Sequence, residues 1–309
     1  MAPYRAPAVL RFALELLPAL GLGLLLGRAF PWLPGRLAGP LIQWGVPISL
    51  TGLLLRAGLR PGLLISGALA LAGTMTGLLL LRSLPPLRRL LPCGSLQLGS
   101  VTGNTAYWGL PVAVALLPPG AIGHAITYDL VGTLITWAIG PLLVEGLPAR
   151  WSALAAALRT SPASRGLVVA VLVQLTPWSA AVASLLAWPA RIVLLVALAV
   201  VGMRLGVMLR RSRPPAPSGV AAALAIKLVL FPALMLAACL VLKLPALVRE
   251  AVVLQAAAPT AISVLLLAEA RPGAADADGA AALVLGGTLL ALATVPLWWG
   301  LLARVSAAG

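Results

Sequence analysis

Long apolar runs, separated by short groups of basic residues, limit this chain to very few kinds of fold. A helix needs about 20 mostly apolar residues to cross the hydrocarbon core of a bilayer, and the runs have about this length. Hydrophobic residues make up 61% of the 309 residues and charged residues only 9%. In a soluble domain, by comparison, about a quarter of the residues are charged. The sequence therefore predicts an all-α integral membrane protein with about ten transmembrane helices.

The apolar runs form two groups of five, divided by a stretch that contains arginines and prolines. The predicted spans lie at about 9–27, 37–55, 61–81, 93–117, 122–145, 165–182, 185–208, 218–242, 248–268 and 279–303. We expect residues 1–146 to form a first five-helix repeat, 147–164 a cytoplasmic linker and 165–309 a second repeat. An odd number of spans in each half makes the second half enter the membrane from the opposite side. The two repeats are therefore expected to be inverted.

The basic residues indicate how the chain is oriented. The formal net charge is +15, and the basic residues occur in small groups between the apolar runs. Nucleic-acid binding needs them gathered on one patch or stripe, so we expect no nucleic-acid partner. More of them fall on the side of the central linker than on the side of the termini, which by the positive-inside rule places both termini outside. Short loops favour the cytoplasmic membrane of a bacterium.

Residues that break helices interrupt the fourth predicted span. Its segment 103–111 reads Gly-Asn-Thr-Ala-Tyr-Trp-Gly-Leu-Pro. Pro111 lacks an amide hydrogen and disfavours helical geometry in the residue before it, and the glycines loosen the backbone. A half-helix starting near Pro111 would direct free N–H groups into the protein, where they can bind an anion. Asn104, Thr105 and Tyr107 can add hydrogen bonds.

A second break is expected in the ninth predicted span, around Pro259. Helix-breaking backbone is tolerated at membrane depth only where protein buries it or a watery cavity receives it. Breaks in corresponding spans of two halves are the best indication, from sequence, of the binding site of a secondary transporter. Because the halves run in opposite directions, the two breaks can cross and face one site. The predicted substrate-binding residues are Asn104, Thr105, Tyr107, Pro111, Gln255, Pro259, Thr260 and Ser263.

Two ionisable residues inside predicted spans are further candidates, because charges are unfavourable in lipid. Asp129, in the fifth span, could accept a proton, bind a coupling cation or hold the broken helix in place; a purely structural contact is the alternative. Lys227, in the eighth span, is a candidate for coupling or gating, unless its side chain extends to the cytoplasmic surface. The single histidine, His124, is expected in the short loop before the fifth span.

The motifs of nucleotide-driven pumps and of enzymes do not occur in the sequence. It contains no Gly-x-x-x-x-Gly-Lys-Ser/Thr pattern, which argues against transport driven by ATP. It contains neither a Gly-x-Ser-x-Gly nor a His-Glu-x-x-His pattern, so we do not expect an enzyme. Two cysteines and one histidine provide no metal-binding spacing. We therefore expect no metal and no cofactor.

The segments around both breaks resemble the auxin efflux carrier family. Asn104 to Pro111 is similar to that family's Asn-Thr…Gly-(Leu/Ile)-Pro signature, with the same seven-residue step from asparagine to proline. Further stretches that resemble the family's fifth, ninth and tenth spans are 128–130, Trp137, 258–261, 267–269 and 287–297.

This resemblance implies a carrier of the bile acid/arsenite/riboflavin transporter class. Such a carrier has ten spans in two inverted repeats, with broken helices that cross at spans four and nine. By position, Asn104, Pro111 and Pro259 would lie at the crossing, with Asn104 near the carboxylate of the substrate. Gly103 stands where plant members have proline, and the long cytoplasmic loop of many plant members is absent. Auxin specificity and control by phosphorylation are therefore not carried over.

Three functions remain open from the sequence. The first is a secondary active or facilitative permease or efflux carrier for small organic anions, such as carboxylates or auxin-like compounds, working by alternating access. The second is a sodium- or proton-coupled symporter of the bile-acid type, with Asp129 and the 255–263 region holding the cation. The third is a membrane receptor that binds an anion without moving it. The expected partners are the organic anion and membrane lipid, and a homodimer is left open.

Overall fold

The computed structural model describes residues 14, 16–145, 151–210, 218–270 and 275–308. Six helical stretches in this part are long and apolar enough to cross a membrane: Leu33–Ala57, Pro61–Ser83, Pro119–Val144, Ala187–Arg210, Val220–Val241 and Ala277–Ser306. Three shorter apolar helices accompany them: Leu17–Ala29, Thr105–Leu116 and Pro162–Gln174. The prediction of an all-helical, multi-pass membrane protein is confirmed. Residues 9–13 of the predicted first span and the boundary at 146–147 lie outside the described residues.

Many of the apolar stretches are divided into shorter elements by a proline or by a wider, π-helical turn. In the first half, the elements are α2 (Leu17–Ala29), α3 (Leu33–Pro40), η3 (Leu41–Gly45), α4 (Val46–Ala57), η4 (Pro61–Leu63), α5 (Leu64–Ser83), α6 (Pro85–Leu90), α7 (Gly94–Gly99), η5 (Thr105–Gly109), α8 (Leu110–Leu116), α9 (Pro119–Gly140) and η6 (Pro141–Glu145). In the second half, they are α10 (Trp151–Thr160), α11 (Pro162–Gln174), α12 (Ser179–Leu185), α13 (Ala187–Arg210), α14 (Val220–Ala225), η7 (Ile226–Leu230), α15 (Phe231–Val241), α16 (Ala246–Ala256), α17 (Ile262–Glu269) and α18 (Ala275–Ala308).

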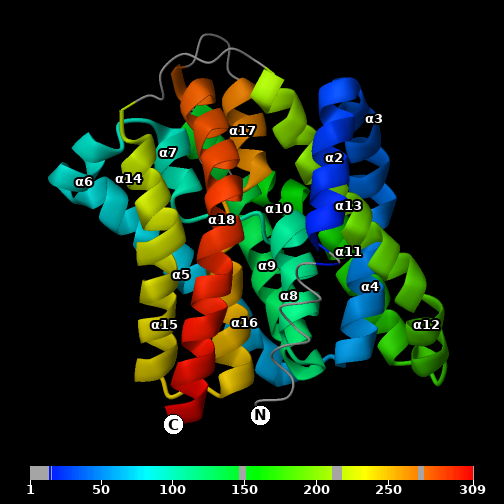
Figure 1. The fold of residues 1–309 in the computed structure, drawn as a ribbon. Coiled ribbons are helices and arrows are strands. Elements are labelled where there is room, and N and C mark those ends of the chain that lie inside the picture. The colour runs from blue at the N-terminus through cyan, green and yellow to red at the C-terminus, as the bar shows by residue number, and fades with distance from the viewer. Residues whose placement is uncertain (1–13, 15, 146–150, 211–217, 271–274, 309) are drawn as a thin grey trace.

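The helices form two neighbouring groups, each built from both halves of the chain (Figure 1). In the first group, α13 packs along α2, and α4 packs against α11, α12 and α13. In the second group, α9 packs against α5 and α16, while α18 packs against α7 and α17. We call them the α2–α13 group and the α9–α18 group. They meet where α4 contacts α9 and where α13 contacts η5.

Glycines bring α2 and α13 into close backbone contact. A Cβ atom added at Gly23 would meet the backbone of Ala199, and one added at Gly202 would meet the backbone of Leu20. Small residues of this kind allow membrane helices to approach closely, where van der Waals contact holds them together. Gly21, on the exposed face of α2, has nothing within 4 Å of such a Cβ.

We expect Gly23→Ala to destabilise the protein and Gly21→Ala to leave it unchanged or slightly more stable. The added methyl group at position 23 has to separate two backbones, and overpacking of this kind costs about 1–3 kcal/mol. At position 21 the same change only improves helix propensity, by up to about 1 kcal/mol. Thermal unfolding of both purified variants in detergent measures the difference. Equal transition temperatures would show that this contact does not hold the α2–α13 group together.

Both predicted breaks are present, and they lie against each other. Between α7 and η5, and again between α16 and α17, the chain leaves the helix. Gly103 and Thr260 form an isolated antiparallel bridge. The amide of Asn104 donates to the carbonyl oxygen of Pro259 at 2.7 Å, and the amide of Ala261 donates to that of Thr102 at 3.3 Å. Each break therefore satisfies backbone groups that the other leaves unpaired, as buried backbone requires.

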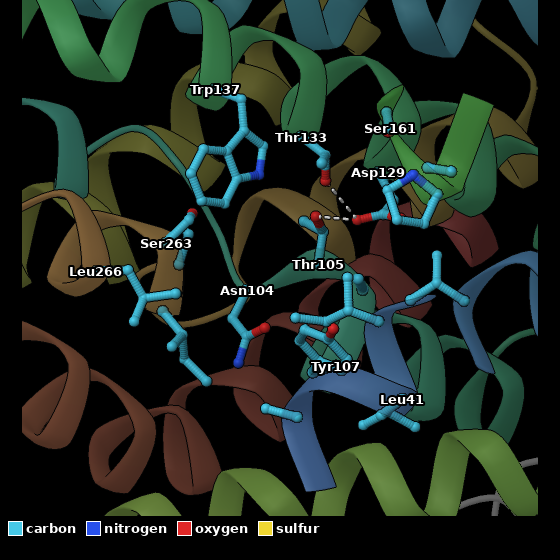
Figure 2. A pocket seen from close by; sticks show the side chains of 18 of the residues that line it. Leu41, Asn104, Thr105, Tyr107, Asp129, Thr133, Trp137, Ser161, Ser263 and Leu266 are labelled. Carbon is cyan, nitrogen blue, oxygen red and sulfur yellow. Dashed lines mark hydrogen bonds between the residues drawn. The ribbon is translucent and has the colours of Figure 1, made fainter. Parts of the chain in front are cut away.

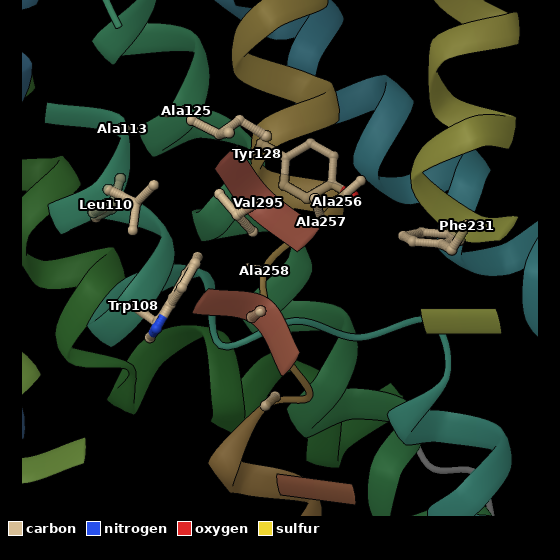
Figure 3. Close-up of a cluster of buried hydrophobic side chains, with 14 of the residues drawn as sticks. Trp108, Leu110, Ala113, Ala125, Tyr128, Phe231, Ala256, Ala257, Ala258 and Val295 are labelled. Atoms are coloured by element: carbon tan, nitrogen blue, oxygen red, sulfur yellow. The ribbon is translucent and has the colours of Figure 1, made fainter. Parts of the chain in front are cut away.

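Small and apolar side chains surround this junction. The second break carries three consecutive alanines, Ala256, Ala257 and Ala258, and Trp108 of the first break is buried in the same cluster (Figure 3). The residues of this cluster that Figure 3 labels are Trp108, Leu110, Ala113, Ala125, Tyr128, Phe231, Ala256, Ala257, Ala258 and Val295, all of them buried.

Three local expectations differ from the structure. The segment predicted as linker contains a helix, α10, in which a run of alanine and leucine favours helical structure. The span predicted to reach residue 182 ends at Gln174, because Pro177 follows closely. His124 lies inside α9 rather than in a loop, since Pro119 starts that helix early. Its Nδ1 atom is 2.8 Å from the hydroxyl of Ser66 on α5.

Candidate functional site

A cavity of about 370 Å³ lies beside the junction of the two breaks (Figure 2). One part of its wall comes from the α9–α18 group: the first break with η5, the middle of α9, and the start of α17. The other part comes from α3, η3, α4, the α10–α11 turn and α13. The cavity therefore lies between the two groups of helices. Its volume is in the range of sites that bind small molecules.

Asn104 lines this cavity and has a buried side-chain donor without a partner. Its backbone oxygen accepts from the amides of Trp108 and Gly109, at 3.1 and 3.0 Å, and so begins η5. Its side chain lines the cavity and is only 5% exposed. Within the described part of the chain, its Nδ2 atom has no hydrogen-bond partner. A buried donor left in this state costs about 1–3 kcal/mol, which a ligand oxygen would recover.

Asp129 ties the first break to α9. Its carboxylate accepts a hydrogen bond of 2.5 Å from the hydroxyl of Thr105 and a longer one, 3.5 Å, from Thr133, one helical turn further along α9 (Figure 2). All three side chains line the cavity. The contact between Asp129 and Thr105 fixes the start of η5 and keeps an acidic group at the cavity wall.

Arg204 is the cavity residue that the sequence analysis missed. It lies in the carboxyl-terminal third of α13, is half-buried, and lines the cavity together with Tyr107. It falls inside the predicted span 185–208, yet it is not among the site residues predicted from the sequence. An ionisable residue within a span is a functional candidate, and that rule alone would have identified it. Among the described residues it makes no ion pair and no hydrogen bond, although its charge interacts electrostatically with Glu269 and Tyr107.

The half-helix of the first break starts earlier than predicted. It begins at Thr105 rather than near Pro111, because a π-helical turn at Thr105–Gly109 precedes the proline and accommodates it. The apolar helix then continues to Leu116. Its amino-terminal residues Thr105, Ala106 and Tyr107 line the cavity.

The predicted site residues divide into two sets. Asn104, Thr105, Tyr107 and Ser263 line the cavity together with Asp129. Pro111, Gln255, Pro259 and Thr260 are not among the lining residues.

Two residues of the second set tie the second break to α9 and to the end of α7. Gln255 donates through Nε2 to the carbonyl oxygen of Ala125 at 3.1 Å. The hydroxyl of Thr260 donates to the carbonyl oxygen of Gly99 at 2.9 Å. Because the two breaks close against each other, these side chains satisfy backbone oxygens and do not reach the cavity.

Lys227 does not extend to the membrane surface, so that alternative is wrong. Its side chain is 0% exposed and points into the α9–α18 group. The ammonium donates to the carbonyl oxygen of Ala256, the last residue of α16, at 2.6 Å. Lys227 is not among the residues that line the cavity.

Paired helix breaks beside a cavity, inside a multi-pass membrane protein, define the class of membrane transport proteins. A family model described as "Membrane transport protein" matches residues 154–299, from α10 into α18. This match, which covers a little less than half of the chain, confirms the resemblance to the auxin efflux carrier family seen in the sequence. Members of a transporter family are generally not enzymes. No curated protein matches the chain.

Proposed function

We propose that this protein is a secondary carrier, a permease or efflux carrier, that moves small organic anions such as carboxylates. The observation that carries the proposal is the cavity at the junction of the two breaks. It combines an unpaired buried amide from Asn104, the amino-terminal end of the Thr105–Leu116 helix, and the guanidinium of Arg204. Together these groups suit the oxygens of one or two carboxylates.

The rest of the cavity wall suits the organic part of such an anion. Leu41, Trp137, Ile262 and Leu266 are among the apolar residues that line it. Sites for small molecules are usually walled in this way, with a few polar groups that fix the orientation of the ligand. An inorganic anion would leave these apolar surfaces without contact, so the cavity favours an organic anion.

The position of the cavity between the two helix groups supports alternating access. We infer that the chain has ten spans in two inverted five-helix repeats, with the broken helices as spans four and nine. Movement of the α9–α18 group, which carries both breaks, against the α2–α13 group would open the cavity to either side of the membrane. Since Arg204 belongs to the α2–α13 group and Asn104 to the other, the anion would contact both groups before the movement.

The charge distribution supports an orientation with both termini outside and the central linker in the cytoplasm of a bacterium. An inside-negative potential then favours export of an anion, by about 2.3 kcal/mol per charge per 100 mV. Export would need no coupling ion.

Asp129 favours one second candidate, a proton- or sodium-coupled symporter. This acid lines the same cavity as the proposed anion-binding groups, so its protonation or the binding of a cation beside it would affect the anion. Under this alternative, uptake depends on sodium or on a proton gradient, and Asp129→Asn abolishes that dependence. Under the first proposal, flux is independent of both ions.

Counterflow in proteoliposomes tests the proposed function. Liposomes that contain the purified protein are loaded with one unlabelled carboxylate and diluted into the same labelled compound, across a panel of mono- and dicarboxylates. We expect at least one labelled carboxylate to accumulate transiently. Uptake no greater than in protein-free liposomes, for every member of the panel, would overturn the proposal. Ligand that binds the protein but never enters the lumen would indicate a receptor instead.

A further inference from the structure

The buried ammonium of Lys227 has no role in the cavity described above. It lies on η7, a π-helical turn in the middle of the apolar stretch Val220–Val241. Among the residues that the structure describes, no carboxylate lies within ion-pair distance of it. A charged group at this depth is unfavourable unless other groups compensate it, so its contacts indicate what it does.

The contacts of Lys227 compensate a positive charge. The carbonyl oxygen of Ala256 accepts from the ammonium at 2.6 Å, and the ring centroid of Phe231 lies 5.2 Å away, within the range of a cation–π contact. Ala256 ends α16, and the carboxyl-terminal end of a helix carries a partial negative charge. An oxygen, an aromatic face and a helix end therefore all attract the same cation.

The carbonyl oxygen of Ala256 is left free by the second break. The amides of Ala257 and Ala258 donate to the oxygens of Val253 and Gln255, so neither of them satisfies Ala256. Carbonyl oxygens at the carboxyl-terminal ends of broken helices are the ligands that hold the coupling sodium ion in many secondary carriers. In this chain a lysine nitrogen occupies that position.

We propose that the Lys227 ammonium is a tethered substitute for a coupling cation, so the carrier works without sodium. The positive charge that stabilises the end of α16 is bound covalently and is present in every state of the transport cycle. A mobile ion would bind and leave with each cycle and would couple transport to its gradient. The inference deepens the proposed function, because it distinguishes the uncoupled carrier from a sodium symporter.

Removing the ammonium should create a site for a sodium ion. Lys227→Ser removes the ammonium and leaves a polar space between the serine hydroxyl and the oxygen of Ala256. Lys227→Met keeps most of the volume but offers no charge and no oxygen ligand. Lys227→Arg keeps the charge. The other lysine of the chain, Lys243, is exposed beyond the end of α15, and Lys243→Met serves as the matched control.

The first experiment measures thermal unfolding of the purified variants in sodium chloride and in choline chloride at equal ionic strength. We expect the native protein, Lys243→Met and Lys227→Arg to unfold at the same temperature in both salts. Lys227→Ser should unfold several degrees lower in choline and recover as sodium is added, because an ion that binds only the folded state stabilises it. Lys227→Met should unfold at the lower temperature in both salts, because it offers sodium no oxygen ligand. A native protein stabilised specifically by sodium would overturn the proposal.

A second outcome of the same experiment is equally decisive. If Lys227→Ser and Lys227→Met behave alike in both salts, the position does not accept a cation and the proposal is wrong. If neither Lys227→Ser nor Lys227→Met folds, the comparison with Lys227→Arg tests the need for a charge. A folded arginine variant beside an unfolded methionine variant supports a required positive charge at this position. An arginine variant that also fails to fold would show that packing, not charge, fixes this residue.

The second experiment measures counterflow of the transported carboxylate with sodium replaced by choline. The native protein should keep its rate, and Lys227→Ser should lose most of its flux in choline and regain it in sodium. Native flux that falls to background in choline would overturn the proposal. If no carboxylate is carried at all, the proposed function fails, but the unfolding experiment still tests Lys227 independently.

Discussion

Replacing Asn104 with alanine is expected to lower carboxylate flux about ten- to a hundredfold while the protein stays folded. Its Nδ2 atom is a buried donor without a partner at the cavity wall, so its hydrogen bond forms only when the anion is present. A hydrogen bond to a charged group contributes about 1.5–3 kcal/mol, and each 1.4 kcal/mol is about tenfold in affinity. Initial rates of counterflow into proteoliposomes measure the effect.

Thr102→Val is the matched control for this prediction. Thr102 is buried in the same break, but its hydroxyl donates to the carbonyl oxygen of Leu98 at 2.9 Å and it does not line the cavity. We expect carboxylate flux through the Thr102→Val variant to stay close to that of the native protein. Native flux in Asn104→Ala, or an equal loss in both variants, would show that the asparagine amide does not contact the anion.

Arg204→Gln is expected to raise the KM for the anion at least about tenfold, because a charged hydrogen bond to the substrate is lost. Arg204→Lys should restore part of the affinity, since lysine keeps the charge but cannot form a bidentate hydrogen bond with a carboxylate. The effect should be larger for dicarboxylates than for monocarboxylates if the second carboxylate lies at Arg204. Concentration dependence of counterflow measures each KM.

The control for Arg204 lies on the same helix. Arg210, at the end of α13, is exposed and donates to the backbone oxygen of Arg28, away from the cavity. We expect Arg210→Gln to leave the KM within about twofold, because exposed contacts contribute little. A KM that changes equally in both variants would reflect net charge and not a contact with the substrate.

The positions of most helices could be predicted because the bilayer sets their length and composition. The helix α5, for example, runs over Leu64–Ser83, and the sequence predicted a span at about 61–81. The breaks were predictable for a different reason. Gly103 loosens the backbone and Pro259 restricts it, so the chemistry of single residues indicates where a helix stops.

What the sequence could not provide is how the elements pack around the cavity. Gln255 and Thr260 are polar residues beside Pro259, yet they satisfy backbone oxygens, because the two breaks close against each other. Arg204 reaches the cavity because α13 packs against η5, a contact between distant parts of the chain. Lys227 turns inward for a similar reason: the free oxygen of Ala256 lies within its reach. Tertiary contacts of this kind are not encoded in local spacing.

The central claim, that the cavity at the two breaks carries an anion across the membrane, is tested most directly by net efflux at an imposed membrane potential. Liposomes loaded with the best carboxylate of the panel are set to about 100 mV, inside negative or inside positive. One elementary charge moved across this potential corresponds to about 2.3 kcal/mol. We predict faster efflux when the lumen is negative. Flux that equals that of protein-free liposomes at both potentials, for every carboxylate, would contradict the claim.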